Sequence, residues 1–187
     1  NLSYSDNQVT VTTDYLTLVY TLNSEGYASQ CVYSLSSQNR IYQFSYSAEG
    51  YLTGIVENID DTEYSSTSLT YENGDITSIS SKMNGLENKF IYEPGEESST
   101  YHLPCLGLLE IHPLTFHIEA LYAGLLGKDP RHFTMHSCPA GSNDEKTVYS
   151  YGFDKKGNPS RMICQTTYAG GQASYYPYTR NISISFE

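Results

Sequence analysis

The chain has 187 residues, 21 acidic and 10 basic side chains, and a formal net charge of −11 at pH 7. Binding to nucleic-acid phosphates requires clustered Lys and Arg, so this balance argues against nucleic acid, and against an anionic membrane surface, as a partner. Nineteen Tyr and no Trp are typical of half-buried β-sheets. The length predicts a single domain over residues 1–187 with a sizeable core.

Short alternating strands make up the first half of the chain. Leu18, Tyr20 and Leu22 share one face, and the residues between them include polar Thr21. This period of two is typical of half-buried strands, and it recurs around Tyr42. The polar, acidic stretch over residues 58–66 is predicted to be a loop.

Three glycines, Gly26, Gly50 and Gly74, follow one another at steps of 24 residues (50 − 26 = 24; 74 − 50 = 24). Each follows a short apolar run and precedes another, so the unit that repeats is predicted to be a β-hairpin. Asn73-Gly74 is the strongest of these turn signals, because both residues tolerate the positive φ of a type I′ turn.

The strand pattern breaks at about residue 96 and resumes near residue 147, so residues 96–146 are predicted to be an inserted segment. Within it, Leu114–Leu126 carries apolar residues at the i, i+3, i+4 spacing of one amphipathic helix of three to four turns. Pro113 suits its first turn, and Gly127 suits a left-handed C-cap. Its apolar stripe is expected to pack on the concave face of the sheet.

Alternation returns at Tyr149 and ends in Ile182–Phe186, which gives roughly twelve strands in all. We therefore predict an all-β fold with one inserted helix. The hairpins would form an antiparallel meander in a strongly curved sheet or barrel, because a flat sheet of this width would expose long edges. The strands are shorter than the roughly 9–11 residues of a membrane barrel strand, and no long apolar run occurs. The chain is therefore not expected to span a membrane.

Two resemblances arise from these motifs. The unit Phe44-Ser-Tyr46 followed by Gly50-Tyr-Leu-Thr-Gly-Ile55 resembles the tyrosine–aspartate repeats of large secreted bacterial toxins. The order of hairpins, then a helix ending in Leu121-Tyr-Ala-Gly-Leu-Leu-Gly127, then two further hairpins resembles a secreted lipoprotein family of unknown function. That family has a porin-like fold and is typical of Bacteroidetes. This likeness implies export, periplasmic or outer-membrane-anchored localisation and a lipid anchor upstream of Asn1, and it supplies no catalytic residues.

Four cysteines are present, at positions 31, 105, 138 and 164, and no pair has the CxxC spacing of a zinc or redox motif. Cys105 and Cys138 flank the predicted helix, so a disulfide between them would clamp it. The alternative is four partly buried free thiols, since free Cys packs as a small hydrophobe.

Histidines gather in the inserted segment. His132 and His136 have the i, i+4 spacing of a helical metal pair, but Pro130 precedes them and no third ligand is suitably spaced. His117 and Glu119 are two residues apart and point to different faces of a helix, which argues against a catalytic dyad. We therefore predict no metal site, no cofactor and no catalytic residues.

The candidate binding residues are Tyr175, Tyr176 and Tyr178, with His112 and His117 from the inserted segment. The tyrosines lie between a Gly-Gly turn and the last strand, and Pro177 disfavours regular pairing there. Exposed tyrosines are favoured at binding surfaces, so contact with carbohydrate or peptide is the functional interpretation. Alternatively, the three rings cap the end of the core.

Three functional hypotheses follow. The leading one is a non-enzymatic, exported cell-envelope binding or scaffold module whose partner is a small molecule, a glycan or a protein. The second is a carrier that holds an apolar ligand between helix and sheet, which a filled interior would contradict. The third is a hydrolase, which requires histidines and carboxylates converging in one pocket.

Overall fold

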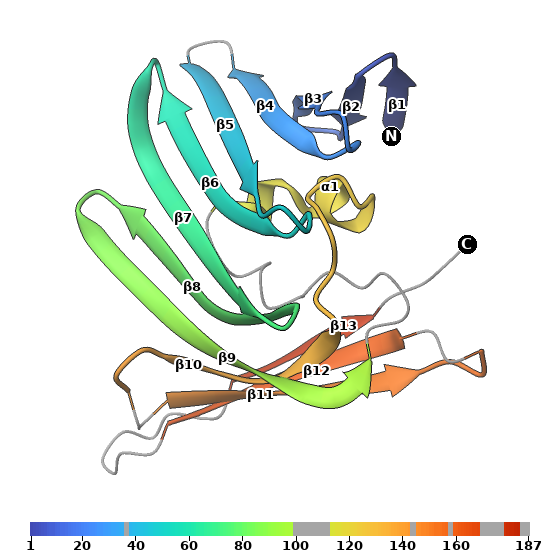
Figure 1. The fold of residues 1–187 in the computed structure, drawn as a ribbon, viewed down its shortest axis with the longest axis vertical. Helices are drawn as coiled ribbons and strands as arrows, with labels where there is room; N and C mark the ends of the chain where they lie inside the picture. Colours follow the sequence, from blue (N-terminus) through green and yellow to red (C-terminus); the bar gives the residue numbers. More distant parts are fainter. Residues whose placement is uncertain (36–37, 99–112, 143–144, 157–158, 169–177, 184–187) are drawn as a thin grey trace.

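The computed structural model describes residues 1–35, 38–98, 113–142, 145–156, 159–168 and 178–183. The described residues form thirteen β-strands, a 3₁₀ turn η2 and a short helix α1 (Figure 1). The elements are β1 (Leu2–Ser5), β2 (Gln8–Thr12), β3 (Thr17–Leu22), β4 (Ala28–Leu35), β5 (Gln38–Tyr46), β6 (Leu52–Ile59), β7 (Thr62–Glu72), β8 (Asp75–Met83), β9 (Leu86–Ser98), η2 (Leu114–Phe116), α1 (Ile118–Tyr122), β10 (His132–Pro139), β11 (Glu145–Phe153), β12 (Pro159–Tyr168) and β13 (Tyr178–Ser183).

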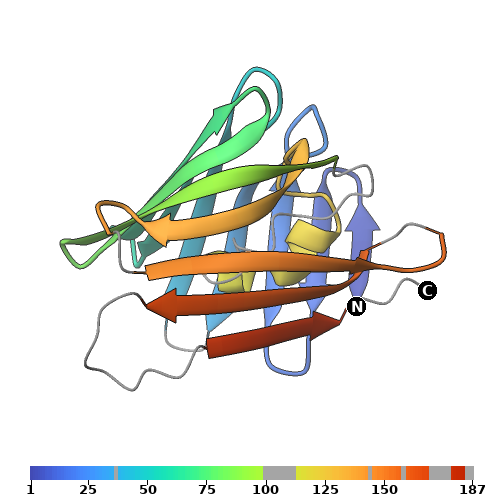
Figure 2. The ribbon, with the colours of Figure 1, turned by 90° about the horizontal axis from the view of Figure 1, so that it is seen from below.

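Each strand pairs antiparallel with its neighbour in sequence, so the order in the sheet runs from β1 to β13 without a crossover. This confirms the hairpin meander. Within the described part of the chain the sheet is open, with β1 and β13 at its two edges, and neither the closed nor the strongly curled form that we predicted is found. Figures 1 and 2 show α1 between the β1–β3 end of the sheet and the β10–β13 end.

The predicted alternation decides which side chains are buried. Val9, Val11, Leu18 and Tyr20 are buried on β2 and β3, while Thr17 between them in sequence is exposed. Tyr42 and Phe44 repeat the pattern on β5. Alternate residues of a strand lie on the same face of the sheet. The face that carries the apolar residues is therefore the one that packs into the core.

The glycine turns are confirmed. Gly26 and Gly50 have φ of +83° and +92°, values that glycine adopts without steric cost. Asn73 and Gly74 both have positive φ, at +54° and +90°, as a type I′ turn requires.

The predicted acidic loop over residues 58–66 is wrong. β6 continues to Ile59 and β7 starts at Thr62, so only Asp60 and Asp61 form the turn. Both have positive φ, at +47° and +65°. Asp tolerates this region because its short polar side chain bonds locally, so a tight hairpin forms here without glycine.

The predicted helix over Leu114–Leu126 is much shorter in the structure. A 3₁₀ turn ends at Phe116, and α1 spans only the five residues Ile118–Tyr122. Gly124, at φ +71°, ends it: the Gly124 N–H donates to Leu121 O and the Leu125 N–H donates to Ala120 O. These two bonds form a Schellman cap, so the helix stops three residues before the predicted cap at Gly127.

The inserted segment is also shorter than the predicted 96–146. β9 extends to Ser98, and β10 within that range pairs with both β9 and β11. The pairing of β10 with β9 shifts register twice, between His132 and Thr134 and between Thr134 and His136. Such irregularities disturb strict alternation, which explains why β10 carries no clear strand pattern in the sequence.

The core is one cluster that joins sheet and helix. Leu114, Ala120, Leu121, Leu125 and Leu126 belong to the same buried cluster as the inward side chains of the strands. The Ala28 N–H of β4 donates to Leu125 O at 2.7 Å, which ties the end of the helical segment to the sheet. No helix in the described ranges has the length and apolarity needed to cross a membrane.

Candidate functional site

Residues 124–132, which we call the strap, leave α1 and cross the row of glycine turns. Leu125 O accepts from the Ala28 N–H at 2.7 Å, the Lys128 N–H donates to Gly50 O at 2.9 Å, and the Arg131 N–H donates to Gly74 O at 3.1 Å. The strap therefore contacts successive hairpins at every third residue. Three extended residues span about 10 Å, which matches two strand spacings of about 4.8 Å each.

The strap lies close to the turns because glycines leave room for it. A Cβ on Gly127, at φ +90°, would lie 2.7 Å from Gly50 O and 3.0 Å from the Tyr46 ring. The Tyr46 hydroxyl donates to Ala28 O at 2.7 Å. Burial raises the pKa of Tyr46, so this phenol remains a neutral donor where β4, β5 and the strap meet.

The far end of the strap is fixed by side chains. Arg131 Nη1 donates to Asn73 O at 3.2 Å. The Asp75 carboxylate accepts from the His132 backbone N–H at 2.8 Å and lies 2.8 Å from His132 Nδ1. The turn at Asn73-Gly74 is thus held from both of its ends.

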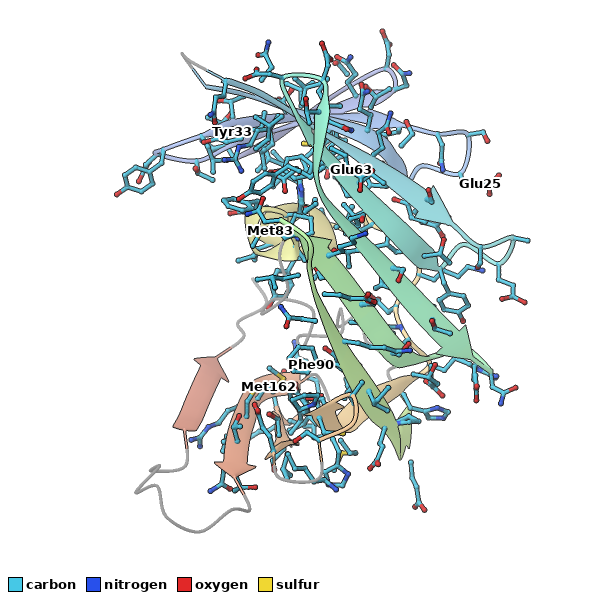
Figure 3. The ribbon with its side chains drawn as sticks, turned by 90° about the vertical axis from the view of Figure 1, so that its left-hand side faces the viewer. Glu25, Tyr33, Glu63, Met83, Phe90 and Met162 are labelled. Carbon is cyan, nitrogen blue, oxygen red and sulfur yellow. The ribbon has the colours of Figure 1, made fainter. Side chains whose placement is uncertain are left out.

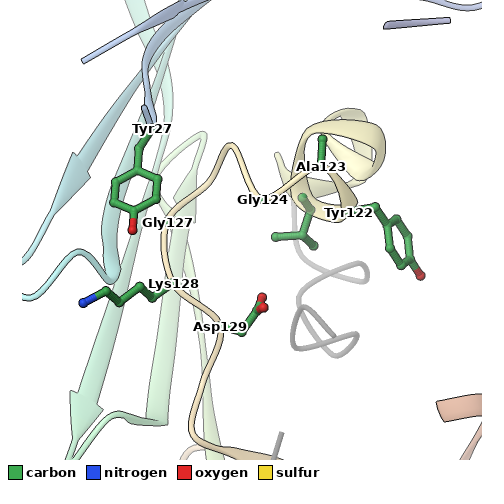
Figure 4. A pocket seen from close by; sticks show the side chains of 8 residues that line it. Tyr27, Tyr122, Ala123, Gly124, Gly127, Lys128 and Asp129 are labelled. Atoms are coloured by element: carbon green, nitrogen blue, oxygen red, sulfur yellow. The ribbon is translucent and has the colours of Figure 1, made fainter. Parts of the chain in front are cut away.

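An open pocket of about 740 Å³ lies between the strap, the end of α1 and the first turn. Its lining is shown in Figure 4 and consists of Tyr27, Leu121, Tyr122, Ala123, Gly124, Gly127, Lys128 and Asp129. A second pocket of about 430 Å³ shares Tyr27 and Lys128 with the first and extends over the first two turns. Its other lining residues are Asn23, Glu25, Tyr46, Ser47, Ala48, Glu49 and Gly50.

We call the two pockets together the strap groove. Tyr27, shared by both, has its ring centroid 5.3 Å from that of Tyr46 at an interplanar angle of 30°. A Cβ on Gly50 would lie 3.1 Å from the Tyr27 ring, so any other residue at position 50 would force this ring to shift by a few tenths of an ångström. Glu25 projects away from the sheet (Figure 3), and Glu49 and Lys128 are also exposed.

Of the predicted binding residues, the structure places His117 in the core. It is fully buried, and its Nδ1 lies 2.7 Å from the Tyr20 hydroxyl. The rings of Tyr42 and Phe44 have centroids 4.4 Å and 5.3 Å from that of the imidazole. Burial raises the pKa of Tyr20. His117 therefore joins the start of α1 to the sheet.

Glu57 is a buried carboxylate that directly precedes residues 58–66, the stretch predicted to be a polar loop. It is fully buried and accepts hydrogen bonds from Arg40 Nη1 at 3.0 Å, the Tyr42 hydroxyl at 3.1 Å and Ser65 Oγ at 2.8 Å. Alternation along the strand could have indicated this burial, because Glu57 lies two residues after Ile55 and therefore on the same inward face of β6. Tyr42 connects this polar cluster to the packing around His117.

The remaining candidates are not brought together. His112, Tyr175 and Tyr176 lie outside the described residues. Tyr178 starts β13, where its backbone pairs with Thr166, and its side chain is not described. The predicted tyrosine cluster and its alternative as a core cap both stay predictions.

His132 and His136 both lie on β10, where a separation of four residues corresponds to about 13 Å. His136 Nδ1 lies 3.1 Å from Glu93 Oε2, whereas His132 contacts Asp75. Among the described residues, no group of three His, Cys, Asp or Glu side chains is arranged to hold a metal ion.

The cysteines favour the thiol alternative. Among the described residues, Cys31 and Cys164 are buried thiols and Cys138 is a half-buried one, and the predicted clamp to Cys105 stays a prediction. Cys105 itself lies outside the described residues. Burial raises the pKa of Cys31 from its ordinary value of 9.0 to about 12, which makes this thiol unreactive at neutral pH.

Comparison with known proteins identifies the family to which this chain belongs. The model of a family described as a domain of unknown function (DUF4595) with porin-like fold matches residues 1–161. The chain belongs to this family. The DUF4595 chain is also similar to the crystal structure of a porin-like protein from Bacteroides uniformis ATCC 8492, with a TM-score of 0.87 and 27% identity. The similarity covers 100% of this chain and 76% of that one. No curated protein matches.

These findings confirm the porin-like fold implied by the order of hairpins and helix in this DUF4595 chain. The likeness to tyrosine–aspartate repeats, export and lipid anchoring stay predictions.

Proposed function

We propose that this chain is a non-enzymatic binding module of the cell envelope that takes its ligand in the strap groove. The observation that carries the proposal is the pair of pockets that meet at Tyr27 and Lys128. Pockets of a few hundred Å³ that combine apolar and polar lining are the usual form of small-ligand sites. The fixed strap and turns would hold such a site rigid, which reduces the entropy lost on binding.

Export to the periplasm or the outer membrane is part of this proposal. It is supported by membership of a family with a porin-like fold and by similarity to a Bacteroides protein. We further propose that α1 packs on the concave face of the sheet. The burial of Leu114, Leu121 and Leu125 in the same cluster as the strands supports this arrangement.

A hydrolase has less support, because the described histidines contact separate partners. His117 contacts Tyr20 in the core, His132 contacts Asp75, and His136 contacts Glu93. General acid–base catalysis requires such groups within hydrogen-bonding reach of one reacting centre, and each of these histidines contacts a partner on a different strand.

A carrier of an apolar ligand is also less favoured. The side chains of Leu114 in η2, Leu121 in α1 and Leu125 in the strap pack in the same cluster as the strands and are at most 7% exposed. A ligand between helix and strands would have to displace this packing.

The test combines localisation with ligand detection. Cell fractionation of the source organism, followed by native mass spectrometry of the purified protein, is expected to find it in envelope fractions with a non-covalent ligand. Material from the same envelope should then perturb the backbone amide signals of Tyr27 and Lys128 in NMR spectra of the ligand-free protein. A cytoplasmic location, or amide shifts confined to residues far from the strap, would contradict the proposal.

A further inference from the structure

We propose that the strap groove binds a neutral oligosaccharide. The inference rests on the proposed function and names the ligand class of the same site. It follows from three properties of the groove: a rigid aromatic platform, mixed charges around the shared residues and backbone groups that are already engaged.

The platform is Tyr27. Its ring is packed beside Tyr46 and against Gly50, so its orientation is fixed before any ligand arrives. Tyr122, which is 41% exposed, lines the same pocket from the end of α1. A tyrosine has a flat apolar body and a polar tip, which suits a sugar ring with C–H groups on its faces and hydroxyls at its rim.

The charges around the platform disfavour a strongly charged ligand. Glu25 and Glu49 line one pocket together with Lys128, so an anionic chain would meet two carboxylates and a cationic chain would meet an ammonium group. Hydroxyls can donate to carboxylates and accept from an ammonium group, so a neutral polyol satisfies both. The chain's net charge of −11 further disfavours an anionic polymer.

The backbone of the strap disfavours an extended peptide. Peptides that bind by strand addition need backbone donors and acceptors on the receptor. Leu125 O, Lys128 N–H and Arg131 N–H already bond to the turns. The side chains of Asn23 and Ser47 accept from the backbone of their own turns. At these positions, recognition by the exposed side chains of the groove is therefore favoured over strand addition.

The size of the groove favours a chain over a single ring. The pockets of about 740 and 430 Å³ share Tyr27 and Lys128 in their linings. A ligand that occupies both would contact the platform of Tyr27.

The experiment is an NMR titration of the full chain with defined probes. The neutral probes are oligosaccharides derived from starch, cellulose, laminarin and chitin. The comparison probes are oligogalacturonate, which is anionic, and an uncharged Gly-Ser peptide. At least one neutral oligosaccharide is expected to give saturable shifts at the amides of Tyr27, Tyr122 and Lys128, while the comparison probes give none.

Variants then locate the site. Tyr27→Ala is expected to weaken binding of that oligosaccharide about tenfold, which corresponds to about 1.4 kcal/mol. Tyr15→Ala is the matched control, because Tyr15 is 91% exposed and lies beyond the opposite end of β3. Should Tyr27→Ala fail to fold, Glu49→Ala tests the same site at an exposed position, with a loss of about threefold expected for one hydrogen bond.

The inference is overturned if no neutral oligosaccharide gives saturable shifts. It is also overturned if Tyr27→Ala and Glu49→Ala both bind the oligosaccharide as tightly as the wild type does. If only the peptide shifts these amides, the proposal of a saccharide ligand is wrong, while the proposal that this site binds a ligand still holds. Failure of envelope material and of every probe to perturb the groove would overturn both proposals.

Discussion

The Tyr20 hydroxyl lies 2.7 Å from Nδ1 of His117, although 97 residues separate the two in sequence. Both side chains are fully buried, and His117 directly precedes α1. This contact fixes the start of the helix on β3, as the bond between Ala28 and Leu125 fixes its other end on β4.

Replacement of Tyr20 by Phe tests how much the contact between Tyr20 and His117 contributes to the free energy of unfolding. The ring is kept, but the buried imidazole loses the hydrogen bond to the phenol, so we expect the free energy of unfolding to fall by about 1–3 kcal/mol. Urea denaturation followed by circular dichroism measures the change. Tyr4→Phe, at a side chain that is 67% exposed, should leave the midpoint unchanged, and equal effects of the two variants would contradict the role assigned to Tyr20.

Glu57→Gln should be destabilising. The carboxylate accepts from Arg40, Tyr42 and Ser65 inside the sheet. An amide can satisfy fewer of these donors and carries no charge to pair with Arg40. Because Arg40 reaches solvent, the main cost is the underpaired buried hydroxyls of Tyr42 and Ser65, which is about 1–3 kcal/mol. Glu63→Gln is the control, because Glu63 is exposed on the neighbouring β7. A thermal midpoint that falls no further for Glu57→Gln than for Glu63→Gln would be the contrary result.

Two glycines with similar backbones should respond differently to alanine. Gly26 and Gly127 have φ of +83° and +90°, but a Cβ meets nothing within 4 Å at Gly26 and meets Gly50 O at 2.7 Å at Gly127. We expect Gly26→Ala to cost about 1 kcal/mol from backbone strain alone. Gly127→Ala should cost about 3 kcal/mol, because overpacking adds to the strain. Denaturant midpoints measure the stability of the two variants. A similar loss of stability for both would show that the strap moves to accommodate the added Cβ at little cost, which would contradict this prediction.

Stability should decline at alkaline pH because of Cys31. Burial raises the pKa of this thiol from 9.0 to about 12 in the folded chain, so the unfolded chain releases the proton first. The contribution is fully present below pH 9 and is lost as the pH rises toward 12, because the unfolded state then binds fewer protons. Burial of Tyr20, Tyr42 and Tyr46 also raises their pKa values and adds to the loss above pH 10.

Cys31→Ala should flatten the part of this profile between pH 9 and pH 10. Iodoacetamide labelling with peptide mapping offers a second readout: at pH 8, the half-buried Cys138 should react faster than the buried Cys31. Equal labelling rates in the native protein would contradict the burial of Cys31.

The hairpins could be predicted because their signals are local. Gly26, Gly50 and the Asn73-Gly74 pair specify turn geometry within four residues, and alternation specifies which face of each strand is buried. The Asp60-Asp61 turn escaped prediction because Asp in the left-handed region looks like any polar loop residue in sequence. β10 escaped because its register shifts break the alternation.

The site could not be predicted in the same way, because its residues meet through distant contacts. The acidic surroundings of Glu57 in sequence conceal its inward position on β6, and nothing local shows that Arg40 and Ser65 will face it. The strap groove likewise joins the turns at Gly26 and Gly50 with a segment that lies far along the chain. The early end of α1 at Gly124 shows a further limit, since Gly124 and Gly127 are equally good caps by sequence.

The match between strap and turns also constrains how the length of this chain can change. The strap advances three residues for every 24-residue hairpin that it crosses. A relative that gained or lost one hairpin in this row would have to lengthen or shorten its strap by three residues to keep every contact. A deletion of one strap residue would instead displace each later bond from its turn. In this part of the fold, insertions and deletions should therefore occur in matched pairs, one in the hairpins and one in the strap.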